Sequence, residues 1–268
     1  MEIVYKTKNQ VGHLEFHGYN GAMDLEHCTH FLQTYEEAAE TPETRIIVLW
    51  GGVDFFSNGI DLNPIHLRYN PVILAYKNLK ALNKIVKRVL ETKNKLVIAA
   101  LRGSAAAGGV MLALAADLRY GRKGIVLNPS YVNMGLSGSE YWSILLPSMI
   151  GYGHTQKLIY EANPISCRKA VELGMLHDQL DMEQNRFCQQ VREKAEYFAR
   201  FNIEARLAAK EVLNKRLLYS MEDQVKLELQ RMKDCCNHAE FQQARTQFVE
   251  KGTEPPQLFP GIALEKDR

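Results

Sequence analysis

The segment from Leu96 to Asp117, LVIAALRGSAAAGGVMLALAAD, constrains the fold of this chain most strongly. It begins as an apolar strand, turns through small residues between Gly103 and Gly109, and continues as an apolar helix. Small residues let a ligand approach the backbone, and the first N–H groups of a helix lack intrahelical acceptors, so this turn can hold a developing negative charge. No acid, base or nucleophile lies between Ser104 and Asp117. Catalytic side chains must therefore come from elsewhere in the chain.

The size and composition predict a folded protein with a large buried core. The chain has 268 residues, of which 46% are hydrophobic, and a formal net charge of +2. This charge balance gives no general reason to expect binding to nucleic acid or to an anionic membrane. Five cysteines without paired metal-ligand spacing indicate a reducing, cytoplasmic environment, and we expect no metal site. The amino terminus lacks a signal-peptide pattern, and no run reaches the about 18 apolar residues of a membrane span.

Strand and helix patterns alternate through the first half of the chain, whereas helical patterns dominate beyond about Ser139. This order predicts an α/β core over residues 1–195, a helical carboxy-terminal region over 196–256 and an irregular tail over 257–268. The expected elements of the core are a hairpin at 2–6 and 11–16, helices at 24–40 and 71–92, and strands at 44–50, from 96 and at 125–127.

Three segments, read in order, resemble the enoyl-CoA hydratase/isomerase family, also called the crotonase superfamily. Residues 20–23 (NGAM) stand where the family has an Asn-Ala-Leu turn, and residues 56–62 (FSNGIDL) resemble its Phe-Ser-Ala-Gly-Ala-Asp-Leu loop. The turn and helix over 103–117 resemble its second glycine turn. The resemblance covers roughly residues 1–256. It implies a spiral of ββα turns with two nearly perpendicular sheets, a helical region that assembles homotrimers or hexamers, and a CoA-thioester substrate.

By this resemblance, the backbone N–H groups of Asn58 and Gly108 form the oxyanion hole for the thioester carbonyl. That carbonyl gains negative charge whether the thioester is enolised, attacked or cleaved. For Lys251, which matches a position that approaches CoA, a solvated helix end is an equal alternative. No cofactor is expected besides the coenzyme A of the substrate. The residues expected to contact the substrate are Phe56, Ser57, Met111 and Lys251.

Two positions depart from the pattern of ordinary hydratases. These enzymes carry a catalytic glutamate three residues after the oxyanion-hole glycine, where this chain has Met111. Their second glutamate follows a proline after the next strand, whereas Pro129 is followed here by Ser130 and Tyr131. Because hydration needs an acid/base pair to place and activate water, we expect an enzyme that is not an ordinary two-glutamate hydratase.

Residues 54–60 and 127–142 resemble more narrowly the crotonase-like carboxy-terminal half of the HypX family of hydrogenase-maturation proteins. The two halves of those proteins make formyl-CoA and split it to carbon monoxide and CoA. The resemblance carries a tyrosine and a glutamate of the decarbonylating site onto Tyr131 and Glu140. The chain departs from the pattern at Asp61 and Ser130, where we expect histidines, and in lacking the formyl-transfer half. Formyl-CoA would then be supplied by a separate formyltransferase partner, or the substrate is another acyl-CoA.

The residues themselves support a proton-transferring role for Tyr131 and Glu140. A carboxyl group beside Tyr141 and Trp142 would have a raised pKa, and a phenol can exchange a hydrogen bond with it. One alternative is that Glu140 supports the helix that starts near Ser139. Two further alternatives are an isomerase or decarboxylase that uses Glu140 as its sole acid, and a catalytically silent acyl-CoA-binding protein.

Overall fold

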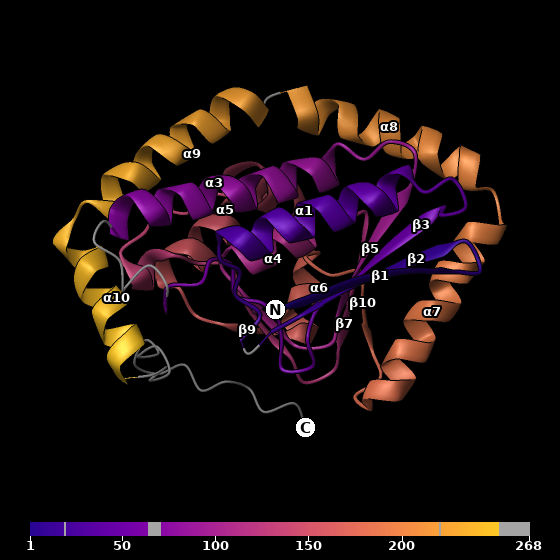
Figure 1. Ribbon diagram of the computed structural model, residues 1–268, viewed down its shortest axis with the longest axis horizontal. Helices are drawn as coiled ribbons and strands as arrows, with labels where there is room; N and C mark the ends of the chain where they lie inside the picture. Colours follow the sequence, from indigo (N-terminus) through magenta and orange to yellow (C-terminus); the bar gives the residue numbers. More distant parts are fainter. Residues whose placement is uncertain (19, 64–70, 220, 252–268) are drawn as a thin grey trace.

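The structure is a computed structural model that describes residues 1–18, 20–63, 71–219 and 221–251. Within these residues the strands form two sheets, in the orders β1-β2-β3-β5-β7-β10 and β4-β6-β8-β9. The larger sheet contains β1 (Glu2–Lys8), β2 (Val11–His17), β3 (Ile46–Trp50), β5 (Leu96–Leu101), β7 (Leu118–Arg122) and β10 (Asp178–Leu180). The smaller sheet contains β4 (Phe55–Ser57), β6 (Ser104–Ala106), β8 (Val126–Asn128) and β9 (Ile165–Ser166). Helices alternate with these strands, which confirms the α/β class (Figure 1).

The larger sheet combines the predicted hairpin with parallel strands. Strands β1 and β2 pair antiparallel, and β2, β3, β5, β7 and β10 pair in parallel. Every residue of β3 and β5 is buried, as expected of parallel strands that are covered on both faces.

Helices cover both faces of this sheet. Helices α1 (Leu25–Glu40) and α3 (Pro71–Leu90) lie side by side on one face, and α7 (Gln184–Arg200) packs on the other (Figure 1). The alternation of strand side chains divides the core accordingly. Ile47 and Leu49 join the hydrophobic cluster of α1 and α3, whereas Ile46, Val48 and Trp50 join that of α7.

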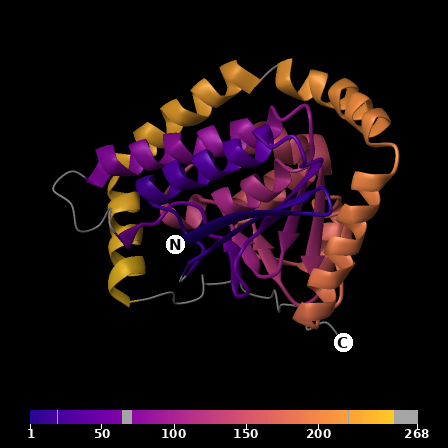
Figure 2. The ribbon, with the colours of Figure 1, turned by 45° about the vertical axis from the view of Figure 1, so that its right-hand side comes forward.

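The remaining helices surround the smaller sheet and the outer edge of the core. Figures 1 and 2 show the carboxy-terminal helices as an arc around the core. Helix α9 packs against α3 and α5, and α10 packs against the short 3-10 turn η1. The expected boundary at residue 195 falls inside α7, and the expected tail at 257–268 lies outside the described residues. The bounds are α4 (Gly108–Leu114), η1 (Val132–Met134), α5 (Trp142–Glu161), α6 (Cys167–Leu173), α8 (Ile203–Tyr219), α9 (Met221–Cys236) and α10 (Ala239–Lys251).

Two short strands follow Ser139, where we expected helical structure to dominate. Strand β9 pairs antiparallel with β8, and β10 adds a sixth strand to the larger sheet by pairing in parallel with β7. The residues of both strands are half-buried and show no apolar alternation, so periodicity gave no signal for them.

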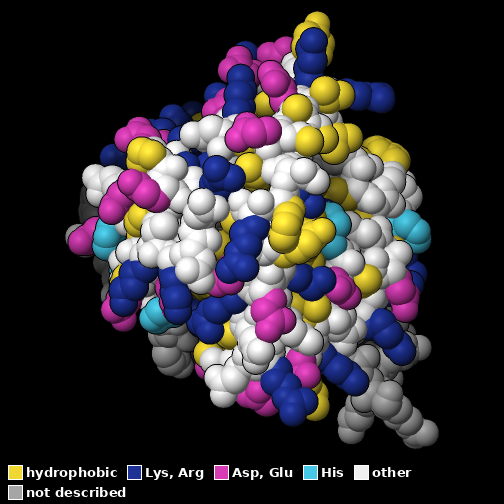
Figure 3. All heavy atoms as spheres, turned by 90° about the vertical axis from the view of Figure 1, so that its right-hand side faces the viewer, with side chains coloured by type: hydrophobic (Ala, Val, Ile, Leu, Met, Phe, Trp, Pro, Cys, Tyr) yellow, Lys and Arg dark blue, Asp and Glu magenta, His cyan; other side chains and the backbone are white. Residues whose placement is uncertain are grey.

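One face of the molecule shows the near balance of charge of the sequence. On the face that α7 and α8 form, acidic and basic side chains are interspersed (Figure 3). Across the part of the chain that the structure describes, no helix combines the length and the apolar character that crossing a bilayer requires.

Candidate active site

Two loops that are far apart in the sequence meet at the amino terminus of α4. A Cβ atom built on Gly59 would lie 3.2 Å from the Gly108 nitrogen, and one built on Gly109 would collide with the Ser57 carbonyl. Because glycine alone fits these close approaches, the loop after β4 lies directly against the start of α4. The structure therefore brings the loop that carries Asn58 against the start of α4 at Gly108. That the two N–H groups form an oxyanion hole stays a prediction.

The two N–H groups of the predicted oxyanion hole differ in their hydrogen bonds. The Asn58 N–H donates to the Gly21 carbonyl over a long 3.4 Å, and among the described residues no acceptor receives the Gly108 N–H. Helix α4 follows Ala107, which has a φ of 48° and no side-chain cap. Such a backbone conformation is strained for alanine and is typical of functional sites. The Gly108 N–H is thus available to a ligand. The Asn58 N–H can bind a ligand only if it gives up its long hydrogen bond to the Gly21 carbonyl.

Tyr131 and Glu140 form a buried hydrogen-bonded pair. The Tyr131 hydroxyl donates to Glu140 Oε2 at 2.9 Å, and its oxygen lies 3.2 Å from the Ser139 carbonyl oxygen. Burial raises the pKa of Glu140 to about 7, against the opposing effect of the hydrogen bond from Tyr131. Burial, followed by the charge of Glu140, raises the pKa of Tyr131 well above its usual value. At neutral pH the pair consists of a neutral phenol and a carboxyl group that can gain or lose a proton.

The carboxyl group of Glu140 lies against Gly108. A Cβ built on Gly108 would come within 3.0 Å of Glu140 Cδ and 3.2 Å of Glu140 Oε1. Oε1 is buried and has no hydrogen-bond partner in the described part of the chain. The structure thus places a carboxyl oxygen without a partner beside the start of α4.

Glu140 does not support the first turn of α5, which was the alternative role. Its φ is 60° and that of Tyr141 is 64°, so both residues lie in a left-handed turn before the helix. The N–H groups of Tyr141 and Ser143 donate to the carboxylate of Glu228 on α9 instead. The backbone N–H of Glu140 donates to Asn83 Oδ1 on α3 at 2.7 Å. The sequence gave no signal for Glu228 or Asn83, because their roles depend on how α9 and α3 pack.

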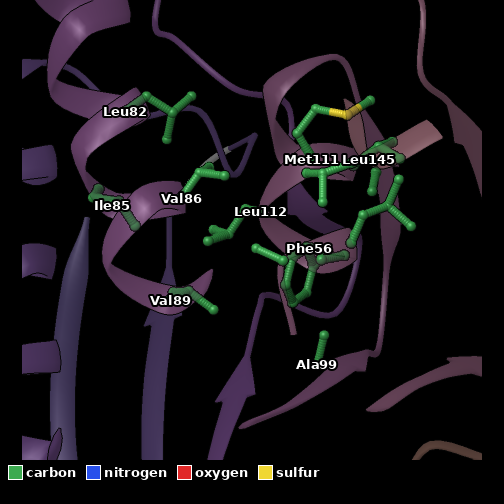
Figure 4. Close-up of a cluster of buried hydrophobic side chains, with 14 of the residues drawn as sticks. Phe56, Leu82, Ile85, Val86, Val89, Ala99, Met111, Leu112 and Leu145 are labelled. Atoms are coloured by element: carbon green, nitrogen blue, oxygen red, sulfur yellow. The ribbon is translucent and has the colours of Figure 1, made fainter. Parts of the chain in front are cut away.

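The predicted substrate-contacting residues have different surroundings. Phe56 and Met111 are fully buried, and Figure 4 shows them within one apolar cluster. Ser57 shapes the loop, because its hydroxyl accepts a hydrogen bond from the Gly59 N–H. Lys251 is the last residue of α10, and its side chain lies outside the described residues. A substrate contact for these four residues stays a prediction.

A metal site has no support in the described residues. No group of three or more His, Cys, Asp or Glu side chains among them is arranged to hold a metal ion. All five cysteines lie in the described part of the chain and are free thiols.

The comparison with protein families shows the family and the fold of the chain. The model of the family described as "Enoyl-CoA hydratase/isomerase" matches residues 6–256. The chain therefore belongs to the enoyl-CoA hydratase/isomerase family. An enoyl-CoA hydratase from Bacillus halodurans superimposes with a TM-score of 0.82 at 20% identity, over 91% of this chain and 98% of that chain, which shows the shared fold.

Within this family the chain is similar to HypX and HoxX. It is 37% identical over 210 residues to the hydrogenase maturation factor HoxX of Bradyrhizobium diazoefficiens, which covers 78% of this chain and 37% of HoxX. A HypX variant from Aquifex aeolicus superimposes with a TM-score of 0.90 at 33% identity, over 96% of this chain and 47% of that chain. HypX in complex with tetrahydrofolic acid matches with a TM-score of 0.90 at 32% identity, over 100% of this chain and 49% of that chain. The chain spans less than half the length of these relatives.

Proposed function

We propose that the chain is a CoA-thioester lyase that splits a small acyl group from CoA, with formyl-CoA as its substrate. The observation that carries this proposal is the contact between the Glu140 carboxyl group and Gly108. It places a proton acceptor with a pKa of about 7 next to an N–H group that can stabilise an oxyanion. The similarity to HypX and HoxX points to the formyl group as the acyl group.

The reaction follows from this arrangement without an oxidant or a cofactor. The thioester oxygen accepts hydrogen bonds from the N–H groups of Gly108 and Asn58. Glu140 Oε1 takes the formyl proton, the electrons of the C–H bond stay on carbon, and the C–S bond breaks with its electrons on sulfur. The products are carbon monoxide and the CoA thiolate, to which Glu140 returns the proton. Tyr131 holds Oε2 and so leaves Oε1 free for the transfer.

The surroundings of the Gly108 α-carbon are crowded. One carbon atom added to Gly108 would lie 2.7 Å from Leu82 Cδ2 and 3.0 Å from Glu140 Cδ. Met111 fills core space where hydratases carry a glutamate, and the Ser130 hydroxyl donates to the Ile159 carbonyl. Without a carboxylate at position 111, the site lacks one member of the acid/base pair that hydration needs, which supports cleavage of the thioester over hydration.

We also propose that the protein forms homotrimers or hexamers and receives formyl-CoA from a separate formyltransferase. Exposed apolar side chains on α8, with Val212 at 76% and Leu213 at 75% exposure, support self-association. Sedimentation analysis of the purified protein tests this assembly, and a monomer at micromolar concentration contradicts it.

The decisive experiment incubates the purified protein with formyl-CoA, traps carbon monoxide on a haem protein and titrates the released thiol. We expect equal amounts of carbon monoxide and CoA. Turnover of an enoyl-CoA or malonyl-CoA substrate without carbon monoxide would support the second candidate, an isomerase or decarboxylase. The raised pKa of Glu140, about 7, supports that candidate, because such a group can both take and return a proton. Binding of CoA without turnover of any acyl-CoA would indicate a silent binding protein.

A further inference from the structure

A buried carboxylate on α9, that of Glu228, binds the segment that contains Glu140. Glu228, which is 5% exposed, accepts a hydrogen bond from the Tyr141 N–H on Oε2 at 3.0 Å. Its Oε1 accepts from the Ser143 N–H at 3.0 Å and from the Ser143 hydroxyl at 2.6 Å. Helix α5 has no side-chain cap of its own at Tyr141, so Glu228 caps it from another helix of the same chain.

Two more side chains hold the same segment. Asn83 on α3 accepts from the Glu140 N–H at 2.7 Å, and the sulfur of Met232 on α9 accepts from the Gly138 N–H at 3.1 Å. The consecutive positive φ angles of Glu140 and Tyr141 are costly for residues other than glycine. Such a turn persists where its surroundings determine it, and here the surrounding groups come from α3 and α9.

We propose that Glu228 is a positioning residue, which holds the left-handed turn at Glu140 and Tyr141 and so keeps the Glu140 carboxyl group against Gly108. This inference rests on the proposed function, in which Glu140 moves the proton. It assigns to α9 a role in the site of its own chain, in addition to any role in assembly.

Glu228 also acts on Glu140 through its charge. Among the described residues, the titratable groups that interact electrostatically with Glu140 include Tyr131, Cys28 on α1 and Glu228. Burial raises the pKa of Cys28 to about 12 and that of Tyr131 well above its usual value, so both are neutral near pH 7. Tyr141, which lies next to Glu228, is also neutral because burial raises its pKa to about 12. Burial raises the pKa of Glu228, and the three hydrogen bonds that its carboxylate accepts oppose this effect. When Glu228 is ionised, its charge raises the pKa of Glu140 in addition to the larger effect of burial.

The test compares Glu228→Gln with Asp234→Asn, a control on the same helix whose carboxylate pairs with Arg231 at the surface. Two quantities are measured for both variants and the wild type. The first is the pH dependence of kcat and KM for formyl-CoA. The second is the titration of Glu140, followed by NMR with ¹³C-labelled glutamate and assigned by the signal that Glu140→Gln loses.

For Glu228→Gln we expect kcat to fall about 10- to 100-fold with little change in KM, because a small displacement of a reacting group is costly. We also expect the pKa of Glu140 to fall, whereas Asp234→Asn keeps wild-type values of both. Glu228→Asp keeps the charge but shortens the reach, so it should lower kcat and keep the pKa of Glu140 near wild type. This variant replaces Glu228→Gln in the kinetic test if the latter does not fold.

Either a wild-type kcat or a wild-type Glu140 titration in folded Glu228→Gln would overturn the inference. If the wild type releases no carbon monoxide, the proposed function fails. The NMR titration then still decides the inference about Glu228, because it needs no turnover.

Discussion

The carboxyl group of Glu140 packs against the α-carbon of Gly108, so that a methyl group on Gly108 would come within 3.0 Å of Glu140 Cδ. Gly108 begins α4, and Glu140 lies in the turn before α5. Their contact joins an N–H group that can stabilise negative charge with a group that can accept a proton. The proposed chemistry depends on this contact more than on either residue alone.

Gly108→Ala should lower turnover sharply. The added methyl group would lie 2.7 Å from Leu82 Cδ2 and 3.0 Å from Glu140 Cδ, so the carboxyl group or α4 must move. Alanine keeps the backbone N–H but displaces it, and losing one oxyanion-hole donor costs about 10²–10³-fold, so we expect kcat to fall about 100-fold or more. Steady-state kinetics with formyl-CoA measures this.

Gly153→Ala is the matched control for Gly108→Ala. Gly153 lies on the exposed side of α5, with open space around its Cβ position. The alanine should therefore stabilise the protein by about 0.5–1 kcal/mol and leave kcat unchanged. Equal activity of the two variants would show that the Glu140–Gly108 contact is not needed.

Tyr131→Phe should move the acidic limb of the pH–rate profile to higher pH. Glu140 acts as a base when it is ionised, so the wild-type rate should fall as the pH drops through about 7. The hydrogen bond from Tyr131 lowers the pKa of Glu140, and its loss therefore raises that pKa. Tyr160→Phe, at an exposed site on α5, is the control and should keep the wild-type profile. A limb that moves to lower pH in Tyr131→Phe would refute this prediction.

Glu140→Gln should change the pH dependence of stability. The pKa of Glu140 is raised from 4.5 to about 7 in the folded protein, so its protonated form stabilises the fold below pH 4.5. This contribution is lost as the pH rises through about 7. The unfolding free energy of the wild type relative to Glu140→Gln should thus fall by about 3 kcal/mol over this pH window. Urea unfolding of both proteins at several pH values measures it, and a constant difference would contradict the burial of an ionisable Glu140.

Lys210→Met should destabilise the protein through a buried ion pair. Lys210 Nζ on α8 lies 2.6 Å from Asp117 Oδ2 and donates to the Lys95 carbonyl at 2.9 Å. Removing the amine leaves Asp117 buried without its partner, which typically costs about 3–5 kcal/mol. Urea unfolding should show this loss. Lys226→Met removes an exposed pair with Asp223 and should leave the unfolding free energy nearly unchanged. A small effect of Lys210→Met would show that α8 is held by other contacts.

Much of the fold could be predicted because its buried elements are long or strongly patterned. The hairpin of β1 and β2, the apolar strands β3 and β5, and the amphipathic helices α1 and α3 all follow from periodicity. Strand β7 (LRYGR) gave no such signal, because Arg119 and Arg122 lie in it and use their guanidinium groups to donate to backbone carbonyls. Strand β10 has three half-buried residues and depends on β7 for its pairing.

In the candidate site too, residues in distinctive turns could be predicted from the sequence, whereas residues that depend on helix packing could not. Gly108, Asn58, Tyr131 and Glu140 lie in turns whose small or polar residues stand out in the sequence, and the structure places these turns together. Glu228 lies in a charged helix with many exposed acidic and basic neighbours, so its burial follows from helix packing alone. Met111 is fully buried within the core, and its contact with the substrate stays a prediction.

The most direct test of the account is a single turnover of formyl-CoA by the wild type and by Glu140→Gln, with carbon monoxide measured by haem trapping. We expect one carbon monoxide for each formyl-CoA that the wild type consumes. We expect a rate at least about 100-fold lower for Glu140→Gln, because the proton acceptor is lost while the fold is kept. Release of carbon monoxide by Glu140→Gln at the wild-type rate, or none by the wild type, would contradict it.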